Sequence, residues 1–197
     1  SESNIFARRE LAFSEYHLAI STGIQKQLLA LGVPAHKIFL IYNPIRTVNK
    51  KTIQTPAAQK PFHAVFIGRI LLDDQKNVRM LLETMAHLDI PWKLDIFGKG
   101  QDLPAAKALA KQLQIAPHIN WRGWVPNPWD FITEADCLLL CSKYEGFPMV
   151  IIEAASYGLP IISTDCPTGP ADIINKDNGI LTPMNDQQAF GTACRQL

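Results

Sequence analysis

The sequence lacks the features of three common protein classes. No apolar run in its 197 residues approaches the ~20 residues that a membrane-spanning helix needs. The formal net charge of +1 gives no sign of a basic binding surface, so we expect no nucleic-acid partner. The polar start Ser1-Glu2-Ser3-Asn4 is unlike a signal peptide, and without an initiator Met the sequence is expected to be a piece of a longer chain.

Cysteine is scarce and shows no metal or redox pattern. The four cysteines are Cys137, Cys141, Cys166 and Cys194, with no CxxC pair and no zinc-site spacing. Cys137 and Cys141 belong to a stretch that is apolar enough to be a buried strand. We therefore expect four reduced thiols in a cytoplasmic protein, because disulfides are rare in that compartment.

What the sequence does contain is a regular alternation of short apolar runs and amphipathic stretches. Strands are predicted at 16–21, 37–42, 64–67, 93–97, 119–121, 138–140, 159–163 and 179–181. Helices are predicted at 7–13, 24–31, 78–88, 103–113, 129–133 and 171–174, after Pro148 up to Gly158, and from Asp186 onward. This alternation predicts an α/β fold with a Rossmann-like, doubly wound parallel sheet.

The predicted elements divide the chain unevenly. Residues 1–35 are expected to be a strand and helix of another domain, and 36–197 to form the main domain. The sheet region, about 60–185, is long enough to bury its own core. Residues 46–61 are polar, with two prolines and three lysines, and are predicted to be a loop or linker.

The most informative stretch is Glu145-Gly-Phe-Pro-Met-Val-Ile-Ile-Glu153, which follows the predicted strand at 138–140. Gly146 allows the backbone to come close to a ligand, and Pro148 suits a first helical turn. The free N–H groups of such a turn attract an anion such as phosphate. At ~3.6 residues per turn, Glu145 and Glu153 lie near one helix face.

Glu153 stands among apolar residues, where an unpaired carboxylate is costly. A pair of sugar hydroxyls could donate to it. The alternative is a structural ion pair with a neighbouring Arg or Lys, and the residues alone leave both interpretations open.

In a parallel sheet the loops after the strand C-termini share one crevice. Four such loops carry glycine or polar residues: Gly68-Arg69 with Lys76, Gly98-Lys99-Gly100, Trp121 to Pro126, and Glu145 to Pro148. Two cations, glycine-lined turns and a helix N-terminus meeting at one place suit a diphosphate. Trp124, or a backbone group near Val125, could face a base.

Each of these residues has a structural alternative. Arg69 could pair with Asp73 or Asp74, and Lys76 could be a solvated residue at a helix start. The turn Gly98-Lys99-Gly100 could be no more than a tight turn. It is not a dinucleotide fingerprint, because Leu103 stands where a third glycine is needed.

Taken together, the motifs resemble the C-terminal half of the retaining family-4 glycosyltransferases, which have the GT-B fold. The matching pieces are Phe66-Ile67-Gly68-Arg69, Lys76-Asn77, Phe97-Gly98-Lys99-Gly100, the two-glutamate motif and Gly158-Leu159-Pro160, in the family's order over about 120 residues. Within the family, Cys166-Pro167-Thr168-Gly169-Pro170 is similar to enzymes that move galactose from UDP-galactose to the lipopolysaccharide core.

The resemblance implies roles for individual residues. Arg69 and Lys76 would bind the donor diphosphate, Glu153 the ribose hydroxyls, and Glu145 would approach the donor sugar. The implied catalytic residues are thus Glu145, Arg69 and Lys76. The wider donor-binding set comprises Gly68, Arg69, Lys76, Gly98, Gly100, Trp124, Val125, Glu145, Gly146, Phe147, Pro148, Met149, Val150 and Glu153.

The resemblance also implies partners that the residues alone do not specify. The donor would be a UDP-sugar, with no metal and no other cofactor. The acceptor, the lipopolysaccharide core, would bind to an N-terminal domain of which only residues 1–35 are expected here. The complete protein is expected to associate peripherally with the cytoplasmic face of the inner membrane. Two rivals remain, a UDP-sugar epimerase of the same fold and a non-catalytic nucleotide-sugar-binding module.

Overall fold

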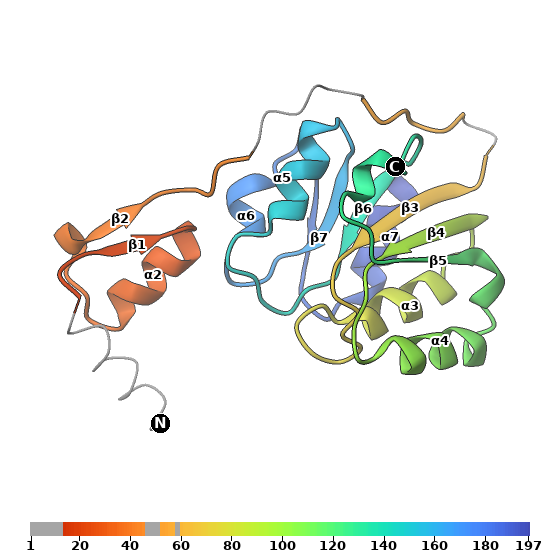
Figure 1. The fold of residues 1–197 in the computed structure, drawn as a ribbon, viewed down its shortest axis with the longest axis horizontal. Coiled ribbons are helices and arrows are strands. Elements are labelled where there is room, and N and C mark those ends of the chain that lie inside the picture. Colours follow the sequence, from red (N-terminus) through yellow and green to blue (C-terminus); the bar gives the residue numbers. More distant parts are fainter. Residues whose placement is uncertain (1–13, 46–51, 58–59) are drawn as a thin grey trace.

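The computed structural model describes residues 14–45, 52–57 and 60–197, and it contains two separate sheets (Figure 1). The predicted helix at 7–13 lies outside the described residues. The strands are β1 His17–Ala19, β2 Ile38–Leu40, β3 Phe62–Ile67, β4 Trp92–Phe97, β5 Ile119–Gly123, β6 Cys137–Leu140, β7 Ile161–Thr164 and β8 Gly179–Thr182. The α-helices are α2 Thr22–Ala30, α3 Val78–Ala86, α4 Leu103–Gln112, α5 Met149–Ser156, α6 Pro170–Ile173 and α7 Gln187–Gln196.

The first unit is a pair of parallel strands, β1 and β2, joined by α2. Ser21 caps α2, because its side chain accepts a hydrogen bond from the N–H of Ile24 at 3.2 Å. The division predicted after residue 35 is therefore wrong in position. It cuts this unit, since β2 pairs with β1 and not with the large sheet.

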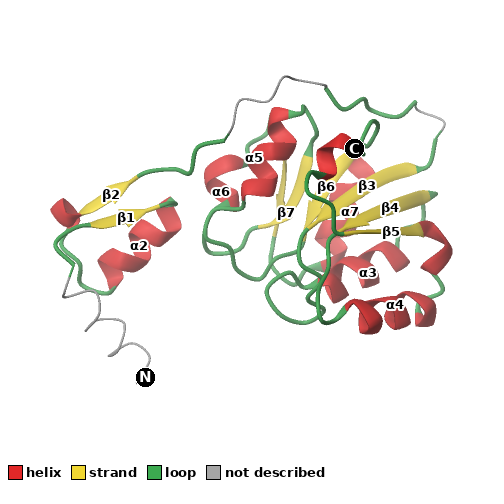
Figure 2. Ribbon diagram, viewed as in Figure 1, coloured by secondary structure: helices red, strands yellow, loops and turns green. Residues whose placement is uncertain are grey.

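The large sheet has six parallel strands in the order β5-β4-β3-β6-β7-β8 (Figure 2). From β3 the chain moves outward to β4 and β5, and from β6 it moves outward in the opposite direction to β7 and β8. The order reverses between β3 and β6, which makes this a doubly wound sheet, as predicted. In such sheets ligands bind beyond the strand C-termini at the reversal.

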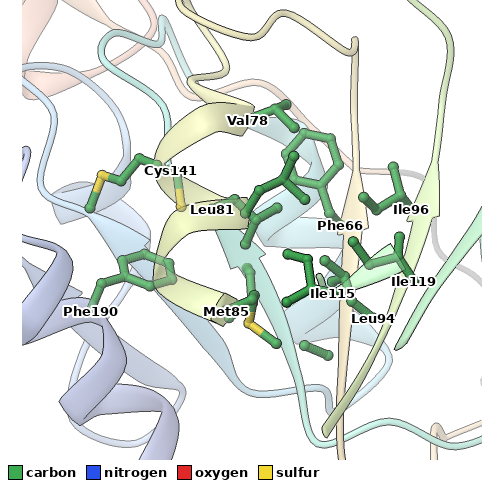
Figure 3. Close-up of a cluster of buried hydrophobic side chains, with 14 of the residues drawn as sticks. Phe66, Val78, Leu81, Met85, Leu94, Ile96, Ile115, Ile119, Cys141 and Phe190 are labelled. Carbon is green, nitrogen blue, oxygen red and sulfur yellow. The ribbon is translucent and has the colours of Figure 1, made fainter. Parts of the chain in front are cut away.

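Each face of the sheet has its own core, because successive strand residues point to opposite faces. On one face, Phe66 and Leu94 pack with residues of α3, α4 and α7, including Leu81, Met85 and Phe190 (Figure 3). On the other face, Val65, Phe97 and Leu138 pack with α5, including Ile151 and Ala154. The helices thus cover both faces, which explains why the strand sequences are apolar at nearly every position.

Three local predictions need correction. The helix predicted at 129–133 is a single 3-10 turn, Pro128–Asp130. Pro148 is the residue that precedes α5, with an extended ψ of 96°, and does not lie in its first turn. The described part of the predicted linker 46–61 includes Ile53, which is buried and donates its N–H to the Tyr157 carbonyl at 3.0 Å. This segment therefore packs into the core of the α5 face.

All four cysteines are free and buried, in agreement with the expected reduced thiols. Burial raises the pKa of the Cys166 thiol to about 11 and that of Cys194 to about 12. Cys137 and Cys141 are also shifted upward by burial, so the thiolate form that reacts is disfavoured at all four positions. No helix in the three described ranges has both the length and the apolar character to cross a membrane.

A polar cluster is centred on Asp95 in β4. Burial alone would raise the pKa of this carboxyl group, but hydrogen bonds from His63, Asn120 and Arg122 outweigh it and lower the pKa to about 2. The donor distances are 3.3 Å from His63 Nε2, 2.7 Å from Asn120 and 3.2 Å from Arg122. Because its partners come from β3 and β5, Asp95 ties the three strands together on one side of the sheet.

The lowered pKa of Asp95 predicts how stability depends on pH. Relative to an ordinary Asp pKa of about 3.9, the shift corresponds to about 2 kcal/mol, which is present above pH 4 and is lost as pH falls toward 2. Asp95→Asn should lower the free energy of unfolding at pH 7, and the difference from the unsubstituted chain should shrink between pH 4 and pH 2. Urea unfolding across this range measures it, with exposed Asp177→Asn as the control. A constant difference at every pH would contradict the role of the charge.

Candidate functional site

A cavity of about 380 Å³ lies beyond the C-terminal ends of β3, β4 and β5, where the order of the sheet reverses. Its lining combines both glycine-containing loops, the loop after β5 and one acid from α5. The lining residues are Ile67, Gly68, Arg69, Phe97, Gly98, Lys99, Trp124, Val125, Pro126, Pro128 and Glu153. Six of the predicted site residues are among them: Gly68, Arg69, Gly98, Trp124, Val125 and Glu153.

Glu153 is the acid that lines this cavity. In the part of the chain that the structure describes, its side chain does not pair with an Arg or Lys, as it would if its role were a structural ion pair. The indole Nε1 of Trp129 donates to Glu153 Oε2 at 2.9 Å. Among the described residues Glu153 forms no ion pair. Its carboxylate is therefore a charged acceptor with one oxygen held by a neutral donor, which suits ligand hydroxyl groups.

Lys76 and Glu145 form a buried ion pair beside the cavity. Lys76 Nζ lies 2.6 Å from Glu145 Oε1, and the two side chains are 13% and 8% exposed. Ser142 Oγ donates to the same oxygen at 2.7 Å. Neither residue lines the cavity, but Lys76 packs against Gly68, which does: a Cβ built on Gly68 would lie 3.6 Å from Lys76 Cε. Two of the three predicted catalytic residues thus form an ion pair with each other, a contact that was not predicted.

Arg69 is exposed at the cavity rim and pairs with neither Asp73 nor Asp74. Its Nη2 donates to Gln75 Oε1 at 2.5 Å. Asp73 instead pairs with Arg79, and the hydrogen bond from Arg79 lowers the pKa of that carboxyl group. Because Gln75 is a neutral partner, the full positive charge of Arg69 remains available to a ligand in the cavity.

Hydrogen bonds tie the loop after β3 to the loop after β6. The side-chain amide of Gln75 donates to the backbone carbonyl of Tyr144 at 3.1 Å. The backbone carbonyl of Gln75 accepts from the N–H of Lys143 at 2.8 Å. Tyr144 also donates its hydroxyl to Asp74 at 3.0 Å. These contacts hold Arg69 and the Lys76–Glu145 pair in one region, although almost 70 residues separate the two loops in sequence.

Gly98 lines the cavity, as predicted, and both Gly98 and Gly100 also have a packing role that was not predicted. A Cβ on Gly98 would lie 1.9 Å from the Gly68 carbonyl oxygen, and one on Gly100 would lie 2.1 Å from that of Ile70. Gly98 also has φ +143°, which L side chains rarely adopt. Both glycines therefore allow two loops to pack backbone against backbone, and Gly100 does not line the cavity at all.

The outer wall of the cavity is aromatic and cationic. Trp124 is 61% exposed, and Lys99 Nζ lies 5.2 Å from the centroid of its ring. Val125, Pro126 and Pro128 continue this wall. A flat, partly exposed ring with neighbouring backbone groups can stack against a planar base, which is the use predicted for Trp124 and Val125.

The loop from Gly146 to Pro148, with Met149 and Val150, does not line this cavity. Phe147 is buried and stacks on Tyr42 with ring centroids 5.2 Å apart, so it joins the small unit to the large domain. No side chain caps α5, which leaves the N–H groups of Met149 and Val150 open to an anion. The ligand-binding role of this loop's backbone stays a prediction, whereas the Phe147 side chain has a packing role.

The segment Cys166 to Pro170 packs directly against this loop. Thr168 donates its hydroxyl to the Glu145 carbonyl. Gly169, at φ +93°, comes so close that a Cβ there would lie 2.5 Å from Pro148 Cδ. The contact supports the backbone on both sides of Gly146.

Four residues that the structure places at the site had no predicted role of their own: Trp129, Ser142, Lys99 and Thr168, the last two named only as parts of longer motifs. Lys99 and Ser142 had a usable signal, because both closely follow a predicted strand. The contacts of Trp129 and Thr168 had none, since each residue reaches its glutamate across more than 20 residues of chain. In the described part of the chain, no three His, Cys, Asp or Glu side chains gather as ligands for a metal ion.

Comparison with known proteins places this geometry in a family. A model of the family described as "Glycosyl transferases group 1" matches residues 61–197, which include the whole cavity lining and the Lys76–Glu145 pair. The chain belongs to the group 1 glycosyl transferases. The GT-B resemblance and the transferase class predicted from the motifs are confirmed.

Two relatives show how near the similarity is. The chain is 39% identical over 184 residues to the lipopolysaccharide 1,6-galactosyltransferase of Escherichia coli. This alignment covers 91% of the present chain and 51% of that protein. The structure of the present chain matches the apo form of the lipopolysaccharide outer core galactosyltransferase WaaB with a TM-score of 0.86 and 37% identity. The match covers 92% of this chain and 52% of the WaaB chain. The chain spans about half the length of the curated relatives it matches.

A solved structure of lower sequence identity shares the fold. Anabaena Alr3699/HepE, in complex with UDP and glucose, has a TM-score of 0.79 and 19% identity over 100% of this chain and 57% of its own. At that identity the match shows the architecture alone.

The loop packing at Gly98 is testable by substitution. Gly98→Ala should lower the free energy of unfolding by roughly 2–4 kcal/mol, because it combines a strained φ with a backbone clash. Gly123→Ala is the matched control, since Gly123 has φ +73° but nothing within 4 Å of a Cβ. Chemical denaturation measures both variants. Equal losses would show that backbone strain alone matters and that the contact with Gly68 does not.

Proposed function

We propose that this chain is the donor-binding half of a retaining hexosyltransferase that moves galactose from UDP-galactose to a lipopolysaccharide core acceptor. The observation that carries the proposal is a single cavity that holds the charged rim of Arg69 and the carboxylate of Glu153, with the Lys76–Glu145 pair beside it. Support for the donor and acceptor comes from the names of the two relatives and from the UDP bound to HepE.

The proposed donor fits the cavity in one direction. The ribose hydroxyls would donate to Glu153, with the base along the wall of Trp124 and Val125. The diphosphate would then lie toward Gly68, near Arg69 and Lys76, and the N–H groups of α5 would face it. This order places the sugar next to Glu145, whose second oxygen makes no hydrogen bond with described residues.

The Lys76–Glu145 pair gives the reaction a source of charge stabilisation. When the bond between the sugar and UDP breaks, negative charge grows on the diphosphate, and Lys76 and Arg69 can stabilise it. The acceptor hydroxyl would attack the anomeric carbon from the face that UDP leaves, so the configuration is retained. Its proton would pass to a phosphate oxygen of the departing UDP, and the protein would act by positioning and electrostatics.

We further propose that this chemistry needs no metal ion. The support is the presence of two cations at the site, which can neutralise a diphosphate in place of a divalent ion. The acceptor would be held by residues outside this half, and the complete protein would work at the cytoplasmic face of the inner membrane as a peripheral protein. Relatives named as transferases weigh against the epimerase alternative.

Donor binding is predicted to stabilise this chain. UDP at a hundredfold excess over its Kd should raise the Tm by roughly 5–10 °C, and ADP and GDP should raise it less. Glu153→Gln should weaken UDP binding about tenfold, because a charged acceptor becomes a neutral one. Calorimetry measures the affinities, and exposed Glu15→Gln is the control. Unchanged affinity in Glu153→Gln would remove Glu153 from the ribose site.

The cations are predicted to act mainly in the transition state. In the complete protein, Arg69→Ala should lower kcat for galactose transfer by about 10²–10³-fold, with a smaller change in the donor KM. Lys76→Ala should likewise lower kcat more than it changes the donor KM. Because this substitution leaves Glu145 unpaired, the Tm of the variant is measured as well. Exposed Lys111→Ala is the control.

Two results would contradict this account of catalysis. A raised KM with unchanged kcat would mean that the cations only bind the donor. Loss of wild-type activity in a chelator, restored by a divalent ion, would overturn the metal-free proposal. Epimerisation of UDP-galactose without an acceptor would favour the epimerase, and donor binding without either reaction would favour a non-catalytic module.

A further inference from the structure

The indole of Trp129 lies directly behind the carboxylate of Glu153. It belongs to the 3-10 turn Pro128–Asp130 and is buried, at 6% exposed. Its ring stacks on Tyr157, with centroids 5.0 Å apart and planes at 18°. Tyr157 ends α5 one turn after Glu153, so the helix that carries the acid also fixes the orientation of the indole.

The hydrogen bond from Trp129 divides the two oxygens of Glu153. Oε2 accepts from the indole at 2.9 Å, whereas Oε1 has no hydrogen-bond partner among the described residues. An indole N–H can only donate, and it carries no charge. The indole therefore orients the carboxylate and leaves its negative charge in place, whereas an Arg or Lys would neutralise that charge. Oε1 keeps its full strength as an acceptor.

Trp129 also connects two parts of the cavity wall. Its neighbour Pro128 lines the cavity together with Trp124 and Val125, on the loop that follows β5. Glu153 lines the cavity from α5. The indole thus joins the wall that would face a base to the acid that would bind a ribose.

We infer that Trp129 is a positioning residue for nucleotide recognition: it holds Glu153 so that one carboxylate oxygen faces the ribose hydroxyls. This inference rests on the proposed function, in which Glu153 binds the ribose. A glutamate side chain has several rotatable bonds, and fixing it before the ligand arrives lowers the entropy lost on binding. The N–H is thus needed for affinity, while the ring serves packing.

Trp129→Phe tests the inference, because it keeps a ring against Tyr157 and removes the N–H. In the 197-residue chain, calorimetry with UDP should show a five- to tenfold weaker Kd. Trp92→Phe, at a buried tryptophan that packs against His118 outside the cavity lining, is the matched control and should leave the Kd unchanged. If the Phe variant does not fold, replacing the indole at position 129 alone with benzothiophene exchanges the N–H for sulfur in a ring of the same shape.

A double-mutant cycle separates positioning from general support. In the Glu153→Ala background, Trp129→Phe should change the UDP Kd by less than twofold, because the indole then has no carboxylate to orient. The ratio of the Kd values for 2′,3′-dideoxy-UDP and UDP should fall toward one in Trp129→Phe alone. A purely structural role would weaken both nucleotides equally and would leave this ratio unchanged.

The outcomes for the two proposals are distinguishable. If the unsubstituted chain does not bind UDP, the proposed function fails, and this inference fails with it. If UDP binds and Trp129→Phe binds it equally well, only the role of Trp129 is overturned. The role of Trp129 would also be overturned if Trp129→Phe weakened UDP binding by the same factor in the wild-type and Glu153→Ala backgrounds.

Discussion

The ion pair between Lys76 and Glu145 joins the two loops that flank the reversal of the sheet. Both side chains are almost fully buried, and Ser142 is a second hydrogen-bond donor to the Glu145 carboxylate. Removing one partner of such a pair typically costs about 3–5 kcal/mol, because the other charge is left buried and unpaired. The site therefore depends on this contact for its shape as well as for its charge. Arg69 and Gln75 are held in the same loop, so their positions depend on it too.

Close backbone packing supplies what the ion pair cannot. The loops after β3 and β4 come together only because Gly98 and Gly100 have no side chains to collide with Gly68 and Ile70. With those loops in contact, the cavity lining includes Gly68 and Gly98, the cations Arg69 and Lys99, and the acid Glu153. Such an arrangement is suited to an elongated ligand with an anionic centre and hydroxyl groups at one end, which describes a nucleotide-sugar.

The small unit contacts the large domain near the same loops. Thr22 donates its N–H to Asp172 at 2.6 Å, and Tyr42 stacks on Phe147. Figure 1 shows this unit beside α5 and α6, away from the far edge of the large sheet. The loop that contains Gly146 is thus packed from two sides, by the small unit and by the segment around Thr168.

The alternation of strands and helices, readable in the order of residues, was enough to predict the parallel sheet and the loops that meet at its edge. This succeeds because hydrophobic periodicity is local, and because parallel strands bring their C-terminal ends to one side. The hydrogen-bond and ion-pair partners of the site residues could not be predicted from the sequence. Glu153 is held by Trp129 and not by a cation, Arg69 by Gln75 and not by Asp73, and Lys76 is bound to Glu145. The last of these contacts joins residues 69 positions apart in the chain, so it exists only once the strands have paired. The packing of Gly98 and Gly100 against the backbone of Gly68 and Ile70 was not predicted either, because it joins two loops that meet only in the folded sheet.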